Sequence, residues 1–221
     1  MSNVSRRTIS ADIIVLAHRG YHAFYPENSM AALCAASGVA DGFETDVRMT
    51  ADGVLVLSHD PDAPNGAPIA SMAYSELNSA FKPRGGLVIF DELLNAVDSN
   101  KFAFIEIKVP GISDRVRRLA SPIFGSRLRI GSFDPGHLVG VPFDMRWLIV
   151  HGADEVPAAL TRFSGIAPRA DAYPFGLDIH ERAAWKVEVA DVSTLLIDGV
   201  SFLITDDPLS VRATINKMRS I

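Results

Sequence analysis

The run Ile13-Ile14-Val15-Leu16-Ala17 decides the fold, because it is apolar on both of its faces. Strands of this kind are typical of parallel sheets that are covered by helices on both sides. A helical pattern follows, in which Ser29 suits the cap and Gly38 the end of the helix. The alternating segment 42–49 comes next. The order strand, helix, strand predicts a mostly parallel sheet.

The same rhythm continues along the chain. The turn Ala51-Asp52-Gly53 predicts a hairpin that leads into the strand 54–57. Further strands are predicted at 102–108, 128–132, 146–150, 170–173, 185–189 and 200–205. Helices are predicted at 89–97, 113–120 and 208–218. About eight parallel strands close a barrel, so we predict a (β/α)8 TIM barrel in which residues 1–221 form a single domain.

Composition limits the class of protein. With 48% hydrophobic and 21% charged residues, the chain has the balance of a soluble globular protein. Its net charge of −5 disfavours a nucleic-acid partner. Cys34 is the only cysteine, so no intrachain disulfide can form, and the run 13–17 is too short for stable membrane insertion. We therefore expect a cytoplasmic protein.

Acidic residues occur where predicted strands end. Glu44 and Asp46 are two residues apart and share one face of their strand, and Glu106 and Lys108 repeat this spacing. Converging carboxylates repel one another unless a cation lies among them, and oxygen ligands favour Mg²⁺ or Ca²⁺. Either of the first two acids alone could equally be a surface acid. The set of three, Glu44, Asp46 and Glu106, predicts a site for one divalent cation.

Two histidines flank these acids at the ends of predicted strands, His18 and His59. Imidazole titrates near neutrality, so one ring can accept a proton from an attacking hydroxyl while the other donates to the leaving oxygen. Arg19 and Lys108 could bind a phosphate. A lone histidine is usually structural, but this pairing with acids indicates catalysis. The residues do not decide which histidine is the acid.

Other polar residues carry weaker predictions. The segment Thr205-Asp206-Asp207-Pro208 is interpreted chiefly as a helix cap followed by a first-turn proline. His151 could reach the same opening, although a structural role is preferred for it. Trp185 is expected to lie half in the core and half at the rim. His22, His137 and His180 receive no role.

These residues resemble the glycerophosphodiester phosphodiesterase family, a group of barrel enzymes. The resemblance rests on segments in the family's order: His18-Arg19-Gly20, Pro26-Glu27-Asn28-Ser29, Gly42-Phe43-Glu44-Thr45-Asp46-Val47, Thr50-Ala51-Asp52-Gly53, His59-Asp60, Ile105-Glu106-Ile107-Lys108, Ser132-Phe133-Asp134 and Thr205-Asp206-Asp207-Pro208. It implies His18 and His59 as the acid–base pair and Glu44, Asp46 and Glu106 as metal ligands. It also implies that Arg19, Lys108 and Trp185 contact the substrate, and that Glu27 is a further ligand or orients His18 or the cation.

Two departures from the family pattern bear on the substrate. The segment 61–71 is short and lacks arginine, where the family carries an arginine-threonine-threonine stretch in a covering insertion. Trp185-Lys186-Val187-Glu188 places a carboxylate where the family has an amide. Both departures could signal a different head group, including a cationic one attracted to Glu188.

The leading hypothesis is a metal-dependent hydrolysis of glycerophosphodiesters to sn-glycerol 3-phosphate and an alcohol. One alternative is an enzyme that cleaves a different phosphodiester. Another is a phosphodiester-binding relative that kept the fold and lost turnover, because fold alone does not fix activity.

Overall fold

The computed structural model describes residues 13–157, 160–176 and 179–220. Its strands are β1 (Ile14–Ala17), β2 (Gly42–Met49), β3 (Leu55–Leu57), β4 (Phe102–Ile107), β5 (Leu128–Ser132), β6 (Arg146–Val150), β7 (Gly165–Pro168), β8 (Glu181–Trp185) and β9 (Phe202–Thr205). Its α-helices are α1 (Met30–Val39), α2 (Tyr74–Phe81), α3 (Phe90–Ala96), α4 (Ser113–Phe124), α5 (Val192–Ile197) and α6 (Pro208–Arg219).

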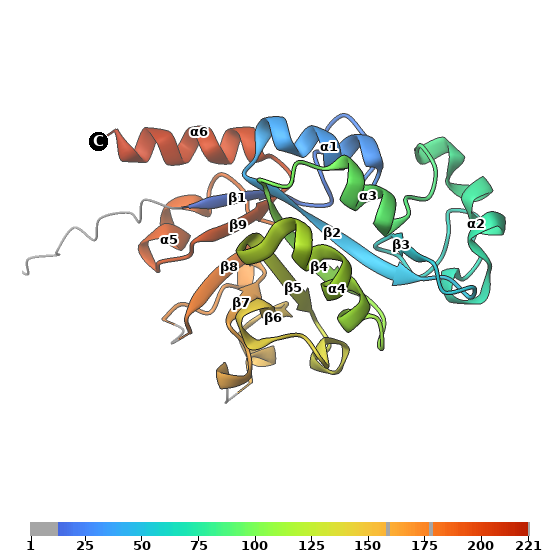
Figure 1. Cartoon of the computed structure of the whole chain (residues 1–221). Helices are drawn as coiled ribbons and strands as arrows, with labels where there is room; N and C mark the ends of the chain where they lie inside the picture. The colour runs from blue at the N-terminus through green and yellow to red at the C-terminus, as the bar shows by residue number, and fades with distance from the viewer. Residues whose placement is uncertain (1–12, 158–159, 177–178, 221) are drawn as a thin grey trace, which may run out of the picture.

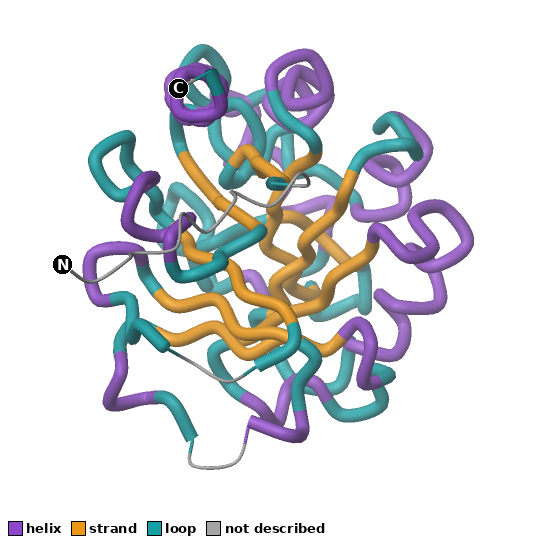
Figure 2. The backbone as a smooth tube through the Cα atoms, turned by 90° about the vertical axis from the view of Figure 1, so that its left-hand side faces the viewer, coloured by secondary structure: helices purple, strands orange, loops and turns teal. Residues whose placement is uncertain are grey.

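One sheet contains all of these strands in the order β1-β9-β8-β7-β6-β5-β4-β2-β3, and the pairing of β1 with β2 closes it into a ring. The hairpin partner β3 is antiparallel to β2, and the other eight strands are parallel to their neighbours. Helices surround the ring on the outside (Figure 2). The predicted single-domain (β/α)8 TIM barrel is confirmed.

The helical layer is uneven. In the described residues between β5 and β8, the connections contain 3-10 turns and no α-helix. The helices α1, α3, α4 and α6 lie along the side that carries β1, β2 and β4 (Figure 1). This leaves one arc of the barrel with short connections between its strands.

Local sequence signals explain several boundaries. The Ser29 hydroxyl accepts a hydrogen bond from the Ala32 N–H at 3.2 Å, which caps α1 as predicted. Asp207 caps α6 in the same way, accepting from the Ser210 N–H at 3.1 Å. Gly53 takes a φ of 80° in the turn between β2 and β3, a conformation that favours glycine.

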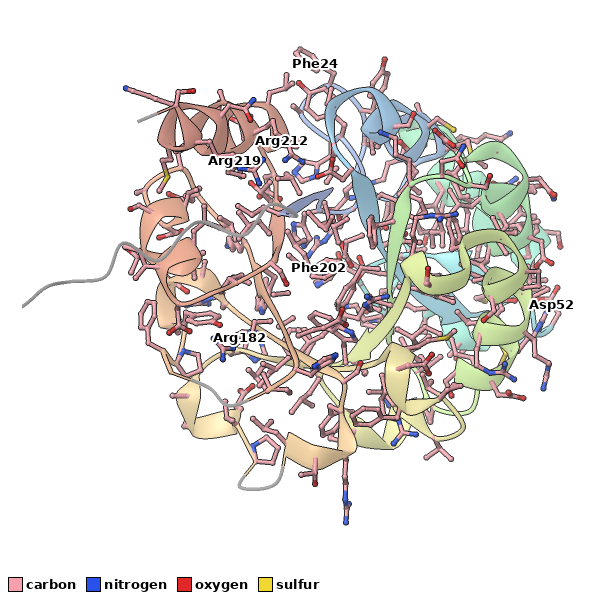
Figure 3. The ribbon with its side chains drawn as sticks, turned by 60° about the vertical axis from the view of Figure 1, so that its left-hand side comes forward. Phe24, Asp52, Arg182, Phe202, Arg212 and Arg219 are labelled. Atoms are coloured by element: carbon pink, nitrogen blue, oxygen red, sulfur yellow. The ribbon has the colours of Figure 1, made fainter. Side chains whose placement is uncertain are left out.

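Aromatic rings fill the inside of the barrel. Trp147 packs edge-on against Phe104 and Phe202, with ring centroids 5.7 and 5.3 Å apart. Phe202 lies in the middle of the ring of strands (Figure 3). The Arg129 guanidinium lies over the Phe202 ring and forms two hydrogen bonds with Glu181, at 2.7 and 3.0 Å. This ion pair lies at the amino end of the barrel, at the starts of β5 and β8.

Two predicted strands were misplaced. The strand expected at 170–173 is β7, five residues earlier, and Ala170–Ala172 forms a 3-10 turn instead. The strand expected at 185–189 is β8, which ends at Trp185. β7 contains Gly165 and Pro168, residues that usually interrupt strands. Glycine is required at 165 because a Cβ there would lie 2.4 Å from the Trp147 ring.

The segment between β3 and α3 contains α2, a helix that the sequence analysis did not predict. Leu77 and Phe81 of α2 pack with Val56, Ala63 and Ile69 in a small cluster of their own. The loop 61–71 is folded onto this cluster through Ala63 and Ile69. In Figure 1 this region extends from the barrel beside the end of β2.

Candidate active site

A cavity opens at the carboxyl ends of the barrel strands, where the sequence analysis placed the site. On one side it is lined by the polar residues His18, Arg19, Glu44, His59, Glu106 and Lys108. On the other side it is lined by Phe133, His151 and Trp185, which we call the aromatic wall. The floor is apolar and includes Ile149, Ala167 and Ile204.

Glu44, Asp46 and Glu106, here called the carboxylate trio, converge beside this cavity. One carboxylate oxygen of each lies within 4.8 Å of the others. The parallel register of β2 and β4 pairs Asp46 with Glu106, and Glu44 shares a strand face with Asp46. All three residues are buried, with relative exposures of 4%, 1% and 7%. The structure therefore brings the three predicted ligands together.

Two cationic side chains approach the carboxylate trio. Lys108 Nζ lies 3.1 Å from Asp46 Oδ1 and 2.5 Å from Glu106 Oε1. Arg19 Nε lies 3.6 Å from Asp46 Oδ2. The Arg19 backbone N–H donates to Glu44 Oε2 at 2.9 Å. Three carboxylates thus face two cations, which leaves negative charge in excess.

The pKa values follow this imbalance. Burial, and then the charge of Asp46, raises the pKa of Glu106 to about 7. Burial and the charges of Asp46 and Glu106 also raise the pKa of Glu44 well above its usual value. Burial alone would raise the pKa of Asp46, but Lys108 and Arg19 outweigh it and lower that pKa. The protein's own cations therefore satisfy Asp46 and leave the two glutamates short of positive charge.

This donor set fits a divalent cation. Each member of the carboxylate trio offers oxygen within the span of one ion, and hard oxygen ligands are those of Mg²⁺ and Ca²⁺. A bound cation would lower the raised pKa values of Glu44 and Glu106, because its charge stabilises their ionised forms. The group itself does not discriminate between the two metals.

His18 follows β1, and its ring is held from one side. Its Nδ1 lies 2.7 Å from Asp206 Oδ1, so the ring donates through Nδ1, and Nε2 lies 3.9 Å from Glu44 Oε2. The hydrogen bond from His18 lowers the pKa of Asp206. The segment 205–208 was interpreted chiefly as a helix cap, and it is also one of the segments that carry the family resemblance. Asp207 is that cap, and its neighbour Asp206 is a site residue that was missed.

His59 has a similar arrangement after β3. Its Nδ1 lies 2.8 Å from Asp60 Oδ1, and this hydrogen bond lowers the pKa of Asp60. Its backbone carbonyl accepts two hydrogen bonds from the Arg48 guanidinium, at 2.6 and 3.1 Å. In both histidines a carboxylate holds Nδ1, so Nε2 is the nitrogen available to a bound substrate.

Arg19 sits in a strained turn that brings it to the cavity. Its φ is 52°, and Gly20 has a φ of 81°. A Cβ on Gly20 would lie 2.6 Å from the Ala32 carbonyl carbon, so only glycine fits there. Glu27 Oε2 accepts a hydrogen bond from Arg19 Nη1 at 2.7 Å. Glu27 thus contacts Arg19 and lies outside the carboxylate trio.

Asn28 is a second residue whose role sequence reasoning missed, although it lies in a segment that carried the family resemblance. Its side chain is buried and its φ is 55°. Nδ2 donates to Asp46 Oδ2 at 2.8 Å, and Oδ1 accepts from the Thr45 hydroxyl at 2.7 Å. Asn28 therefore fixes the orientation of one member of the carboxylate trio.

The aromatic wall closes the far side of the cavity. Phe133 and Trp185 are perpendicular, with centroids 5.7 Å apart, and Trp185 Nε1 donates to the Val150 carbonyl at 3.0 Å. Trp185 is half-buried and lines the cavity, as the analysis of the sequence expected. His151, for which a structural role was preferred, is a cavity residue. Glu188 is exposed and does not line the cavity.

Comparison with known proteins identifies the family. The model of the glycerophosphoryl diester phosphodiesterase family matches residues 18–194. This range begins at His18 and includes the carboxylate trio, His59, Lys108 and the aromatic wall. The chain belongs to the glycerophosphoryl diester phosphodiesterase family.

Curated relatives match part of the chain. A glycerophosphodiester phosphodiesterase of Bacillus altitudinis is 30% identical over 145 residues, which cover 56% of this chain and 59% of that protein. The Bacillus subtilis (strain 168) protein YqiK is 32% identical over 107 residues, 45% of this chain and 37% of that protein. The matched part of the chain therefore spans less than two thirds of these curated relatives.

Solved structures share the fold over most of the chain. A glycerophosphodiester phosphodiesterase of Thermotoga maritima superposes with a TM-score of 0.75 at 23% identity, covering 95% of this chain and 100% of that one. An Oleispira antarctica phosphodiesterase, solved in complex with the product sn-glycerol-3-phosphate, superposes with a TM-score of 0.73 at 17% identity, covering 93% and 97%. Separately, within the part of the chain that the structure describes, no helix is long and apolar enough to cross a membrane.

Proposed function

We propose that this protein hydrolyses glycerophosphodiesters to sn-glycerol 3-phosphate and an alcohol with the help of one divalent cation. The observation that carries the proposal is the position of the carboxylate trio beside a cavity that His18 and His59 also line. Membership of the family and the name of the Bacillus altitudinis relative support the same substrate class. So does the product bound to the Oleispira antarctica phosphodiesterase.

The proposed roles follow from the contacts. Glu44, Asp46 and Glu106 would hold Mg²⁺ or Ca²⁺, which would offset charge on the phosphate oxygens and make a nearby hydroxyl more acidic. Arg19 and Lys108 lie beside the carboxylate trio, where their charges can bind the same phosphate.

Proton transfer is assigned to the two histidines. One Nε2 accepts the proton of the attacking hydroxyl, either the glycerol 2-hydroxyl or water, and the other donates a proton to the leaving alcohol oxygen. The carboxylates of Asp206 and Asp60 orient these rings through Nδ1. With water as the nucleophile, one P–O bond forms, one breaks, and the proton taken from water balances the proton given to the alcohol. With the glycerol 2-hydroxyl, the same exchange releases the alcohol and leaves a cyclic phosphate. A second exchange, in which water opens the ring and the two histidines reverse their roles, then gives sn-glycerol 3-phosphate.

The aromatic wall would contact the organic groups of the substrate. Phe133 and Trp185 offer apolar faces to the cavity. Glu27 would support substrate binding by holding the Arg19 guanidinium. We also propose that the protein acts on small molecules in the cytoplasm, because Cys34 is its only cysteine and its net charge of −5 suits no nucleic-acid surface.

The experiment is a hydrolysis assay with sn-glycero-3-phosphocholine and sn-glycero-3-phosphoethanolamine, each with Mg²⁺ and with Ca²⁺. Release of sn-glycerol 3-phosphate is measured for the wild type and for His18→Ala and His59→Ala. Each substitution is expected to lower kcat roughly 10²–10⁴-fold, the range for a positioned acid or base.

His180→Ala is the matched control, because His180 lies with Arg129 and Glu181 at the amino end of the barrel. It should keep full activity. Near-full activity of His18→Ala would refute the assigned acid–base role. Cleavage of other diesters, but of neither glycerophosphodiester, would favour a different substrate. Binding of these diesters without product under saturating metal would favour a non-catalytic relative.

A further inference from the structure

His151 lines the cavity but takes no part in the proton transfers assigned above. It follows β6, across the cavity from the carboxylate trio. Its ring stacks on Phe133, with centroids 4.5 Å apart and planes 27° apart, and lies edge-on to Trp185 at 5.9 Å. Two aromatic neighbours therefore contact the imidazole, whose side chain is 58% exposed.

Glu155 fixes the rotation of the same ring. Its carboxylate accepts a hydrogen bond from the His151 backbone N–H at 2.8 Å and lies 3.1 Å from His151 Nδ1. Glu155 ends the 3-10 turn Ala153–Glu155, so both contacts come from one short loop. This makes His151 the third histidine of the cavity whose Nδ1 is held by a carboxylate.

The remaining nitrogen of the ring determines what His151 can bind. When Nδ1–H donates to Glu155, Nε2 of the neutral ring is a hydrogen-bond acceptor. The surfaces nearby are apolar: Phe133 and Trp185 in the wall, and Ile149 and Ala167 in the floor. One acceptor set among apolar faces suits a small group with carbon–hydrogen faces and a hydroxyl.

We propose that His151, positioned by Glu155, accepts a hydrogen bond from a hydroxyl of the substrate's glycerol group and is a specificity-determining residue. This inference rests on the proposed function, since it assumes that a glycerophosphodiester occupies the cavity. Of the two organic groups on such a diester, the glycerol is small and constant, whereas the alcohol varies. The apolar wall and floor residues beside His151 line the same cavity as the ionic groups, and Lys108 Nζ lies 5.7 Å from the centre of the Phe133 ring. A constant small group bonded to the phosphate therefore fits beside His151.

Ligand binding tests this role without turnover. The probes are sn-glycerol 3-phosphate and inorganic phosphate, each titrated calorimetrically in the presence of Mg²⁺. His151→Phe keeps an aromatic ring against Phe133 and removes the acceptor. It is expected to raise the Kd for sn-glycerol 3-phosphate about tenfold, as for the loss of one hydrogen bond, and to leave the Kd for inorganic phosphate unchanged. His151→Gln restores an acceptor and should recover most of this loss.

Two further variants separate positioning from general damage to the loop. Glu155→Ala should weaken sn-glycerol 3-phosphate binding about threefold, because the ring loses its orientation but keeps its acceptor. Asp154→Ala is the control, because Asp154 is exposed in the same turn and its substitution removes the same charge. It should bind both probes like the wild type.

The affinity ratio of the two probes decides the outcome. A His151→Phe protein that binds both probes as the wild type does would overturn the proposal, as would an equal loss for both probes. A steady-state comparison should show a higher KM for sn-glycero-3-phosphoethanolamine with kcat kept within about threefold, the pattern for lost uniform binding. If no glycerophosphodiester is hydrolysed, the proposed function fails, and the binding ratio still decides the role of His151.

Discussion

The Nδ1 atom of His18 lies 2.7 Å from Oδ1 of Asp206, although 188 residues separate the two in the sequence. The contact exists because β9, which ends at Thr205, pairs in parallel with β1, which ends at Ala17. Closure of the barrel therefore also orients a histidine at the mouth of the cavity.

Asp206→Ala should lower kcat roughly 10²-fold, the lower end of the range for a positioned acid–base group, because the His18 ring loses its orientation. Thermal unfolding should change little, since Asp206 is exposed. Asp207→Ala is the contrasting control: it removes the cap of α6 and should cost about 1 kcal/mol of stability with kcat retained. Full activity in Asp206→Ala would show that His18 does not depend on this contact.

Asn28 allows a prediction that separates strain from lost hydrogen bonds. Its φ of 55° is tolerated by glycine and disfavoured for alanine. Asn28→Gly should destabilise by about 1–3 kcal/mol, because Thr45 and Asp46 lose a buried partner. Asn28→Ala should cost about a further 1–2 kcal/mol from backbone strain. Urea unfolding of both variants measures the difference, and equal values would contradict the strain argument.

Cation binding should raise the thermal stability of the folded protein. Adding Mg²⁺ or Ca²⁺ to chelator-treated protein should raise the unfolding temperature, by an amount equivalent to about 2.7 kcal/mol at one hundred times Kd. Asp46→Asn and Glu106→Gln should each abolish most of this rise, since each removes a charged ligand from the carboxylate trio. Glu92→Gln, an exposed acid in the first turn of α3, should respond like the wild type. An unchanged rise in both trio variants would place the cation elsewhere.

The metal-free protein should lose stability as pH rises. The pKa of Glu106 is raised from its usual 4.5 to about 7 in the folded protein. Between these values the folded state binds more protons than the unfolded state, so unfolding becomes easier as pH increases. The stabilising contribution is present below about pH 4.5 and is lost as pH passes 7. Glu44, whose pKa is also raised, acts in the same direction.

Unfolding temperatures of chelator-treated protein between pH 4.5 and 7.5 test this dependence, with Glu106→Gln as the comparison. The variant should show a flatter decline than the wild type, because the amide does not titrate. Adding Mg²⁺ or Ca²⁺ to the wild type should reduce the decline at the upper end of the range. A constant gap between wild type and variant at every pH would refute the assignment to Glu106.

The carboxylate trio could be predicted from the sequence because its members lie within neighbouring strands. Glu44 and Asp46 lie two residues apart on β2, and Glu106 on β4 pairs with Asp46, so strand geometry alone brings the three side chains together. His18 could be predicted for a related reason, because it directly follows the strand β1. The barrel itself followed from the spacing of apolar runs, including the buried strand β1.

Residues whose role depends on another segment could not be found in this way. Asp206 meets His18 only after β9 pairs with β1, and Asn28 reaches Asp46 from a loop rather than a strand. The signal for Asp206 was its place directly after the last strand, but the adjacent cap, Asp207, explained the local pattern. β7 and β8 were misplaced because Pro168 and the charged start of β8 oppose strand propensity.

The division of the cavity into two arcs has a consequence for how the family can diversify. The ionic groups come from β1 to β4 and the turns that follow these strands. The aromatic wall comes from the ends of β5, β6 and β8, and the described connections between β5 and β8 contain no α-helix. Insertions or substitutions in that part of the barrel can reshape the space offered to an organic group without moving the acids or the two flanking imidazoles. New substrates can therefore arise through changes in one half of the ring while the chemistry in the other half is inherited intact.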